Sequence, residues 1–195
     1  MNKQTTRIFT GNEAALAYAI SAKRICGDNA DFLSANPAIV PIFVSLLFQS
    51  LEISIKQAGV DSGLFTMQEA RARQQRSGHG IKELAALAVD RLGGDPFGPV
   101  IMAMTFANTH TNSGRIIKEM ICGDSLQKTR ESYASRQLGY GEVAEGDFAI
   151  IEPLSDWIES VKETASNLPK IIDILSQWKA SASKSKHFAI WLRER

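Results

Sequence analysis

The sequence contains few of the residues from which metal sites and disulfide frameworks are built. Its 195 residues include two cysteines, Cys26 and Cys122, and three histidines. The two cysteines lack the CxxC spacing of zinc ligands, and His110 has no carboxylate or cysteine at ligand spacing. The sequence therefore predicts two reduced thiols and no metal site.

Strong net charge and long hydrophobic runs are also lacking. The formal net charge is +1, so no overall field attracts nucleic acid or an anionic membrane, and any such contact needs a local patch. The most apolar run, IVPIFVSLLF, has ten residues, whereas a membrane span needs about twenty. MNKQTTRIF has no apolar core of signal-peptide length, and no GxxxxGK[ST] motif offers a phosphate cradle. We expect a soluble, cytoplasmic protein without a cofactor or membrane contact.

Alternating strand patterns are absent, and apolar residues instead recur at helical spacing. The predicted fold is all-α, with five to seven helices in a single domain over residues 1–180. A polar linker and an amphipathic tail follow at 181–195. The clearest helical segments are 13–26, 40–58, 67–76, 81–92, 114–122, 125–138 and 154–175.

Capping residues and helix breakers set the expected helix ends. Thr10 with Glu13, and Thr66 with Glu69, have the spacing of capping boxes. Gly27 is expected to stop the first helix. The expected loops and breaks are 28–37, 108–113 and 139–148, with a hinge at 123–124 and a helix end at residue 59.

Two stretches resemble the HEPN superfamily, the helical domains of bacterial toxin–antitoxin and defence proteins. LLFQSLEISIKQAGV matches the family's Gln-x-x-Glu-x-x-x-Lys pattern at Gln49, Glu52 and Lys56. SGHGIKELAALA is similar to the family's His-initiated helix, His-Asp-Leu-x-x-Leu, with His79 at the histidine position. The following positions of that pattern hold Gly80, Ile81 and Leu84. The resemblance spans roughly residues 37–92, less than half of the chain.

The resemblance implies an antiparallel helical bundle that forms a homodimer. Some members of the superfamily are metal-independent ribonucleases, and others bind nucleotides or act as non-catalytic interaction modules. Our leading hypothesis is an interaction module of the second kind, binding a protein or a nucleotide-bearing partner in a defence or toxin–antitoxin setting. The alternatives are an endoribonuclease of the toxin type and a structural helical bundle unrelated to this superfamily.

Arg73 and His79 are the candidate catalytic residues of the ribonuclease alternative. The superfamily's ribonucleases carry Arg-x4–6-His, and five residues separate this pair. A histidine can exchange a proton with the ribose 2′-hydroxyl, and an arginine can steady the phosphorane charge. However, Gln74 follows Arg73 in place of the usual Asn, Asp or His, and His79 stands at the family's structural helix start. In the simpler interpretation, His79 begins a helix, and Arg71, Arg73 and Arg76 lie on a solvent-exposed helix face.

A second set of candidates could hold a phosphate and a stacked base. Arg130, Tyr133 and Arg136 recur at i, i+3 and i+6, and Arg115 and Lys118 belong to the preceding predicted helix. A solvated helix face with Tyr133 tucked in is the simpler alternative.

Glu52 and Lys56 lie at i,i+4 on an apolar helix. They form either an ion pair at the edge of the core or a buried charge pair that sets helix packing or the dimer register. The apolar seam of 154–175 is expected to pack in the core. In the alternative of a self-associating helix pair, Trp157 and Trp178 would lie at the interface.

Overall fold

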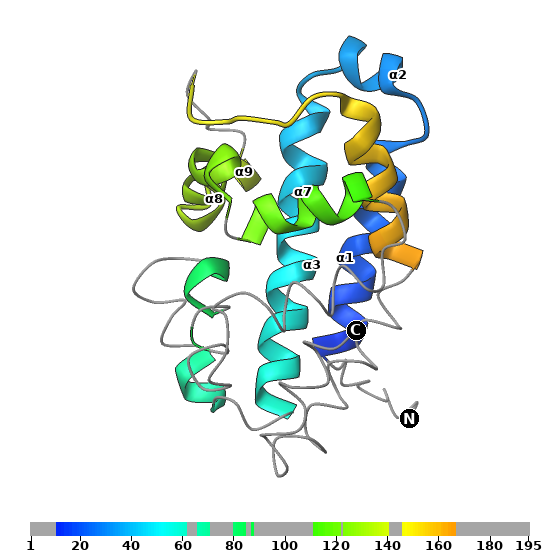
Figure 1. The fold of residues 1–195 in the computed structure, drawn as a ribbon. Coiled ribbons are helices and arrows are strands. Elements are labelled where there is room, and N and C mark those ends of the chain that lie inside the picture. The colour runs from blue at the N-terminus through cyan, green and yellow to red at the C-terminus, as the bar shows by residue number, and fades with distance from the viewer. Residues whose placement is uncertain are drawn as a thin grey trace, which may run out of the picture.

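The computed structural model describes residues 11–61, 66–70, 80–84, 87, 111–121, 123–140 and 146–166. These residues are mostly helical and include no β-strand (Figure 1). The predicted all-α class is confirmed. Residues 181–195, predicted to form a linker and a tail, lie outside the described part of the chain.

Helices α1 (Gly11–Cys26) and α3 (Ile39–Asp61) form the central pair of the fold. They lie side by side and run in opposite directions (Figure 1). The Ser50 hydroxyl of α3 donates a hydrogen bond of 2.8 Å to the Ala15 carbonyl of α1. This close approach is possible because the buried face of α1 carries only small side chains. These are Ala15, Ala19, Ala22 and Cys26.

Between these helices, residues 28–37 do not form the predicted loop throughout. They include a short helix, α2 (Ala30–Ala35), which begins after Asn29. The Asn29 side chain accepts a hydrogen bond of 2.8 Å from the Asp31 backbone N–H, which caps the helix. Leu33 is fully buried and anchors this turn of helix to the core. One cap and one buried side chain thus form a helix too short to give a periodic sequence signal.

Three predicted helix ends can be compared with the structure. Gly27 has a φ of +69° and ends α1, as predicted. Helix α3 continues to Asp61 and passes the predicted end at Gly59, because a glycine stops a helix only where the backbone turns left-handed. The Thr66–Glu69 capping box is confirmed. The Thr66 N–H donates to Glu69 Oε2 at 2.7 Å, and the Glu69 N–H donates to Thr66 Oγ1 at 3.1 Å.

The second half of the described chain contains helices α7 (Thr111–Ile121), η1 (Asp124–Leu126), α8 (Gln127–Ala134) and α9 (Gln137–Tyr140), and a further helix at 154–166. Helix α7 crosses in front of α3, and α8 and α9 lie beside the first half of α3 (Figure 1).

Two predictions about this region are wrong. Residues 111–113 were expected in a break but form the first turn of α7. The helix predicted over 125–138 is interrupted after Ala134, where Arg136 has a φ of +67°. The predicted hinge at 123–124 is confirmed, because η1 begins there.

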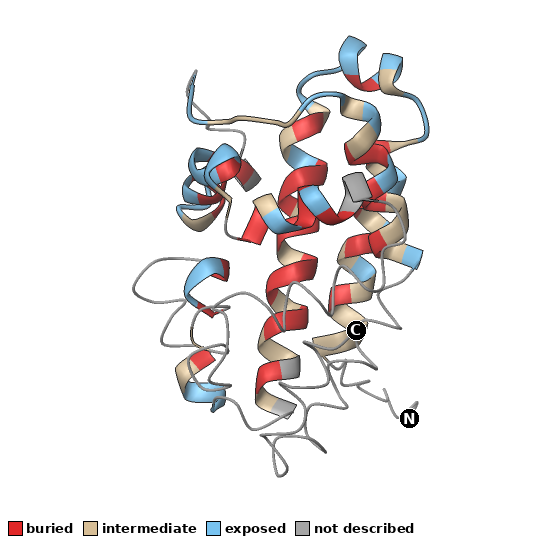
Figure 2. Ribbon diagram, in the orientation of Figure 1, coloured by how far each residue is buried: buried red, intermediate tan, exposed pale blue. Residues whose placement is uncertain are grey.

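The hydrophobic core lies along α3 and includes buried residues of α1, α7 and the 154–166 helix (Figure 2). Phe43 and Trp157 meet edge to face with ring centroids 6.3 Å apart. The Trp157 indole N–H donates to the Ile151 carbonyl at 2.9 Å, and its side chain is fully buried. Trp157 is therefore a core residue of its own chain, as the expected packing of the 154–175 seam in the core predicted. Trp178 lies outside the described residues.

The apolar stretch of helix α3 is longer than the ten-residue run that stands out in the sequence. By length and composition, its stretch Ile39–Gln57 could cross a membrane. About 61% of that stretch is buried inside the protein.

Candidate functional site

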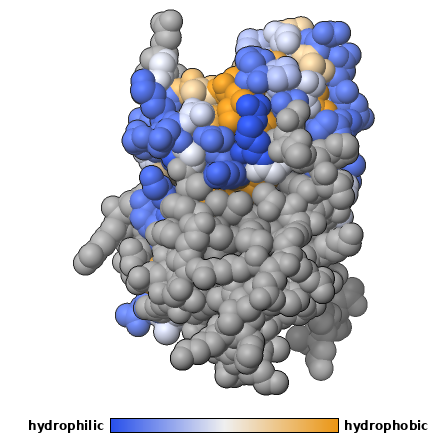
Figure 3. All heavy atoms as spheres, viewed as in Figure 1, coloured by the Kyte–Doolittle hydropathy of each residue, from blue (hydrophilic) through white to orange (hydrophobic). Residues whose placement is uncertain are grey.

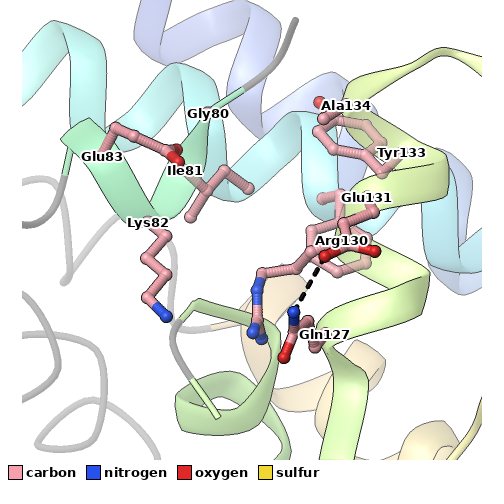
Figure 4. Close-up of a pocket in the computed structure, with 10 residues that line it drawn as sticks. Gly80, Ile81, Lys82, Glu83, Gln127, Arg130, Glu131, Tyr133 and Ala134 are labelled. Carbon is pink, nitrogen blue, oxygen red and sulfur yellow. Dashed lines mark hydrogen bonds between the residues drawn. The ribbon is translucent and has the colours of Figure 1, made fainter. Parts of the chain in front are cut away.

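A cavity of about 380 Å³ lies between the 80–84 segment and helix α8. Phe48 of α3 also lines it, and Figure 4 shows the lining residues of the 80–84 segment and α8. The cavity brings together residues from three separate parts of the sequence. Its lining consists of Phe48, Gly80, Ile81, Lys82, Glu83, Gln127, Arg130, Glu131, Tyr133 and Ala134.

The Tyr133 side chain forms one wall of the cavity and connects α8 to α3. Its ring stacks on Phe48, with centroids 4.9 Å apart and planes inclined by 19°. Its hydroxyl donates a hydrogen bond of 2.6 Å to Glu52 Oε2. The two residues are 81 positions apart in the sequence, so this bond is a tertiary contact. It holds Tyr133 in one orientation at the cavity wall.

Glu52 is a buried carboxylate with a donor on each oxygen. Its side chain is 3% exposed, and that of Lys56 is 19% exposed. Lys56 Nζ pairs with Oε1, and the Tyr133 hydroxyl donates to Oε2. Burying a charge is costly unless it is paired and hydrogen-bonded, and both conditions are met here. The pair thus lies inside the fold, where the loss of either partner would leave a buried charge without its donor.

Burial raises the pKa of the Tyr133 hydroxyl, and the neighbouring Glu52 carboxylate raises it further. The phenol therefore stays protonated over the physiological pH range and continues to donate to Glu52. Because this hydroxyl is already engaged as a donor, its role is to position the cavity wall.

Arg130 occupies the wall on the same helix. It is 9% exposed, and its Nη1 donates a hydrogen bond to the Glu119 carbonyl at the end of α7. The Gly123 N–H donates to the same carbonyl at 3.2 Å. The carbonyls of a last helical turn lack partners within their own helix, so the guanidinium both completes α7 and is held in place by it.

Positively charged, negatively charged and neutral polar side chains all line the cavity. In Figure 4, Lys82 and Arg130 extend to the same side of the space, and Glu83 lies toward the opposite side. The Gln127 amide N–H₂ donates to Glu131 Oε1 at 2.9 Å, which holds these two side chains along α8. Basic and acidic side chains are therefore mixed around the cavity, since Glu131 lies beside Arg130 in the same view.

The five predicted phosphate- or nucleotide-binding residues do not form one surface. Arg130 and Tyr133 line the cavity, whereas Arg115, Lys118 and Arg136 do not. Arg115 is 52% exposed and pairs with Asp156 at 3.5 Å. Lys118 is exposed on α7, and Arg136 is exposed in the turn after α8, off the helix face that holds Arg130.

Tyr133 is buried against Phe48, as the simpler interpretation predicted, but Arg130 is buried as well, so the predicted solvated face is wrong at that residue. Its ring is stacked within the protein and does not offer a free face for a base. Arg73 and His79, the candidate catalytic pair, lie outside the described residues.

Sequence reasoning missed Phe48, Lys82 and Gln127 as members of the site. The sequence pattern predicts Phe48 to be an ordinary core residue and Lys82 to be an exposed residue of a helix. No local pattern connects them, because the cavity arises only when α8 packs beside the 80–84 segment. Two signals in the sequence point to the region: the spacing of Arg130 and Tyr133, and the stretch at Gly80 and Ile81 that precedes Lys82.

Apolar side chains are also exposed away from the cavity. The large ones are Ile20, Phe32, Ile42 and Met67. In the view of Figure 3, apolar atoms of the described residues lie between hydrophilic side chains in the upper part of the molecule. Single exposed apolar side chains are normal on protein surfaces and do not by themselves mark a site.

Among the described residues that line the cavity there is no histidine, cysteine, serine or threonine. Within the ranges that the structure describes, no group of three or more His, Cys, Asp or Glu side chains could hold a metal ion. Comparisons with protein-family models, with curated proteins and with solved structures found no match.

Proposed function

We propose that this chain is a HEPN-like antiparallel helical bundle that forms a homodimer in the cytoplasm. In this proposal it binds a partner without catalysing a reaction. The single observation that carries the binding function is the cavity of about 380 Å³ between the 80–84 segment and α8. Small-molecule sites commonly have volumes of about 300–1,000 Å³, so this cavity has the size of a binding site for a small group.

The lining favours a nucleotide-bearing partner over a purely apolar protein segment. Two cations, Lys82 and Arg130, two carboxylates and the Gln127 amide stand beside the apolar side chains of Ile81 and Ala134. The two carboxylates are Glu83 and Glu131. Such a mixture suits a ligand with an anionic end and an organic body. The buried Glu52–Tyr133 bond supports the same function, because it holds the wall in place before a ligand arrives.

The homodimer is tested by the mass of the purified chain in solution. Light scattering at micromolar concentration should give twice the chain mass of 21.4 kDa. A dilution series should show the mass falling toward that of a single chain as the dimer dissociates. A mass of one chain throughout the micromolar range would remove the homodimer from the proposal.

One observation keeps the endoribonuclease as a second candidate. Gly80, which follows His79 in the sequence, lines the cavity together with Arg130. If the chain cleaves RNA through the predicted pair, Arg73→Ala and His79→Ala should each abolish cleavage of a single-stranded RNA and remove toxicity in cells. Unchanged cleavage and toxicity in both variants would eliminate this candidate.

A further inference from the structure

Residues 147–152 form an extended segment that crosses the upper part of the fold (Figure 1). Two hydroxyls of α8 hold its backbone. The Ser132 hydroxyl donates to the Asp147 carbonyl at 2.8 Å. The Thr129 hydroxyl donates to the Ala149 carbonyl at 2.6 Å and accepts from the Ala149 N–H at 2.9 Å. Asp147 and Ala149 therefore direct backbone groups toward α8.

The next backbone contact of this segment keeps the same spacing. The Ile151 carbonyl accepts a hydrogen bond of 2.9 Å from the Trp157 indole N–H. The contacts thus fall on every second residue, which is the period of an extended chain. In such a chain, neighbouring residues direct their N–H and C=O groups to opposite edges. The backbone groups of Phe148 and Ile150 therefore form an unpaired edge, and no hydrogen bond within the described part of the chain uses them.

The side chains along the unpaired edge are apolar in the middle and acidic at both ends. Phe148, Ile150 and Ile151 are half-buried and pack against the core, whereas Asp147 and Glu152 flank them and are exposed. The surrounding sequence, residues 137–161, contains six acidic side chains and no lysine or arginine. An unpaired backbone edge is a template for another extended chain, and these charges favour a basic one.

We propose that the unpaired edge binds an extended segment of a partner protein in which apolar residues are flanked by lysine or arginine. The partner segment exchanges main-chain hydrogen bonds with Phe148 and Ile150, and its basic residues lie beside Asp147 and Glu152. This surface goes beyond the cavity proposed above, because none of residues 147–152 is among the described residues that line it.

A second copy of this chain fits the unpaired edge poorly. If two 147–152 segments paired in antiparallel register about Ala149, Asp147 of each copy would lie close to Glu152 of the other. Like charges at neighbouring positions of paired strands destabilise the pairing. Charge therefore favours a different, basic chain over self-association at this edge.

The test uses the full chain and a synthetic peptide with blocked ends, Lys-Lys-Val-Thr-Val-Thr-Val-Lys-Lys. Isothermal titration measures its affinity, and amide hydrogen exchange followed by NMR locates it. In the free chain, the Phe148 and Ile150 amides should exchange faster than the Ala149 amide, which donates to Thr129. Saturating peptide should slow exchange at Phe148 and Ile150 about tenfold or more, because both amides gain an acceptor.

Two matched peptides separate the main-chain contribution from that of charge. N-methylation of the central valines and threonines removes their N–H groups and keeps their side chains, and should abolish binding. Glutamate in place of the four lysines should weaken binding about tenfold or more at low salt. An affinity equal to that of the parent peptide in either case would overturn the proposal.

Two variants at Ile150 test the edge from the side of the protein. Ile150→Ala keeps the N–H and loses most of the side chain, whereas Ile150→Pro also removes the N–H. Ile150→Pro should therefore bind the peptide about tenfold more weakly than Ile150→Ala. Equal affinity of the two folded variants would contradict pairing at this edge.

Charge variants test the choice of partner and do not depend on the proline variant being folded. Asp147→Asn combined with Glu152→Gln should weaken peptide binding about three- to tenfold. Asp31→Asn combined with Glu159→Gln removes two exposed carboxylates outside the segment and should change binding less than about twofold. Circular dichroism establishes whether each variant is folded. Equal losses in the two double variants would contradict recognition of the basic residues by Asp147 and Glu152.

Three further results would overturn the proposal. One is the absence of binding by the parent peptide, and another is binding that leaves exchange at Phe148 and Ile150 unchanged. The third is slow exchange of these two amides in the free chain that becomes fast on dilution, because it would assign the edge to a second copy.

Discussion

At the scale of single residues, the contact between Tyr133 and Glu52 matters most for the site. The i,i+4 spacing of Glu52 and Lys56 predicts their ion pair, and the structure contains it. The same spacing does not predict that the pair is buried or that Tyr133 is its third partner. Tyr133 joins the pair from 81 positions away because α8 packs against α3. A local pattern can thus identify two members of a network, and tertiary packing supplies the third.

Replacing Tyr133 by phenylalanine removes this bond and keeps the stacking on Phe48. The buried Glu52 carboxylate loses a donor, so we expect Tyr133→Phe to lower the free energy of unfolding by about 1–3 kcal/mol. Urea denaturation followed by circular dichroism measures the change. Ser34→Ala, which removes an exposed hydroxyl of α2 that donates to the Ala30 carbonyl, is the control and should cost less. Equal losses in the two variants would argue against a special role for the Tyr133–Glu52 bond.

The same residue predicts how stability depends on alkaline pH. The pKa of Tyr133 is raised in the folded state from its ordinary value of 10.0, first by burial and then by Glu52. Above that value the unfolded chain releases the phenol proton while the folded chain keeps it. The stability that the protonated Tyr133 hydroxyl contributes to the folded state is therefore complete below pH 10.0. It is lost as the pH rises above that value.

The measurement is the stability difference between the wild-type chain and Tyr133→Phe over a range of alkaline pH. This difference should shrink by up to about 1.4 kcal/mol per pH unit above pH 10 or so, since one proton is involved. Using the difference cancels the titration of lysines and other tyrosines common to both chains. A difference that stays constant from about pH 9 to pH 11 would contradict the raised pKa.

At the scale of the elements, the turn after α8 shows why some helix ends could be predicted and others could not. The glycine at position 27 predicts a left-handed conformation there, because glycine adopts a positive φ without strain. Arg136 adopts a φ of +67° in an otherwise helix-compatible stretch, and no sequence signal marks it. The break is held by tertiary and turn contacts, including the bond from the Arg136 N–H to the Tyr133 carbonyl at 2.9 Å.

The left-handed turn leads to a prediction about Arg136. Glycine removes the strain of a positive φ, about 1–2 kcal/mol, but makes the unfolded chain more flexible by about 0.4–1 kcal/mol. We therefore expect Arg136→Gly to be neutral or to stabilise the protein by up to about 1 kcal/mol. Arg136→Ala retains the strain and should be less stable than Arg136→Gly in thermal unfolding. The reverse order would show that Arg136 does not hold a left-handed conformation.

The remaining differences between prediction and structure are also differences of packing. Helix α2 is short and depends on Asn29 and the buried Leu33, so periodicity could not reveal it. The continuation of α3 past Gly59 and the start of α7 at Thr111 both extend helices through residues of low intrinsic propensity. Propensity gives a weak expectation that tertiary contacts override. The segments 13–26 and 40–58 were predicted to be helical and belong to α1 and α3, because their apolar faces already require a partner.

At the scale of the whole molecule, composition and periodicity predicted the helical class but could not predict the cavity. The apolar character of α3 predicted a buried helix, and its buried face does lie along the core. The cavity depends on how α8 sits beside the 80–84 segment, which is a matter of relative placement. Of the residues proposed from sequence to bind phosphate, Arg130 and Tyr133 reach it. Arg130 is positioned by α7, and Tyr133 by α3.

The most direct test of the account is to locate binding on the folded chain. Amide chemical shifts should be recorded while the isotopically labelled protein is titrated with adenosine monophosphate. We predict the largest changes at residues 80–83 and 127–134, small changes on α1 and α2, and an unaltered nucleotide after prolonged incubation. Changes centred on α1 and α2, a conversion of the nucleotide, or no changes at all would contradict a non-catalytic binding site between the 80–84 segment and α8.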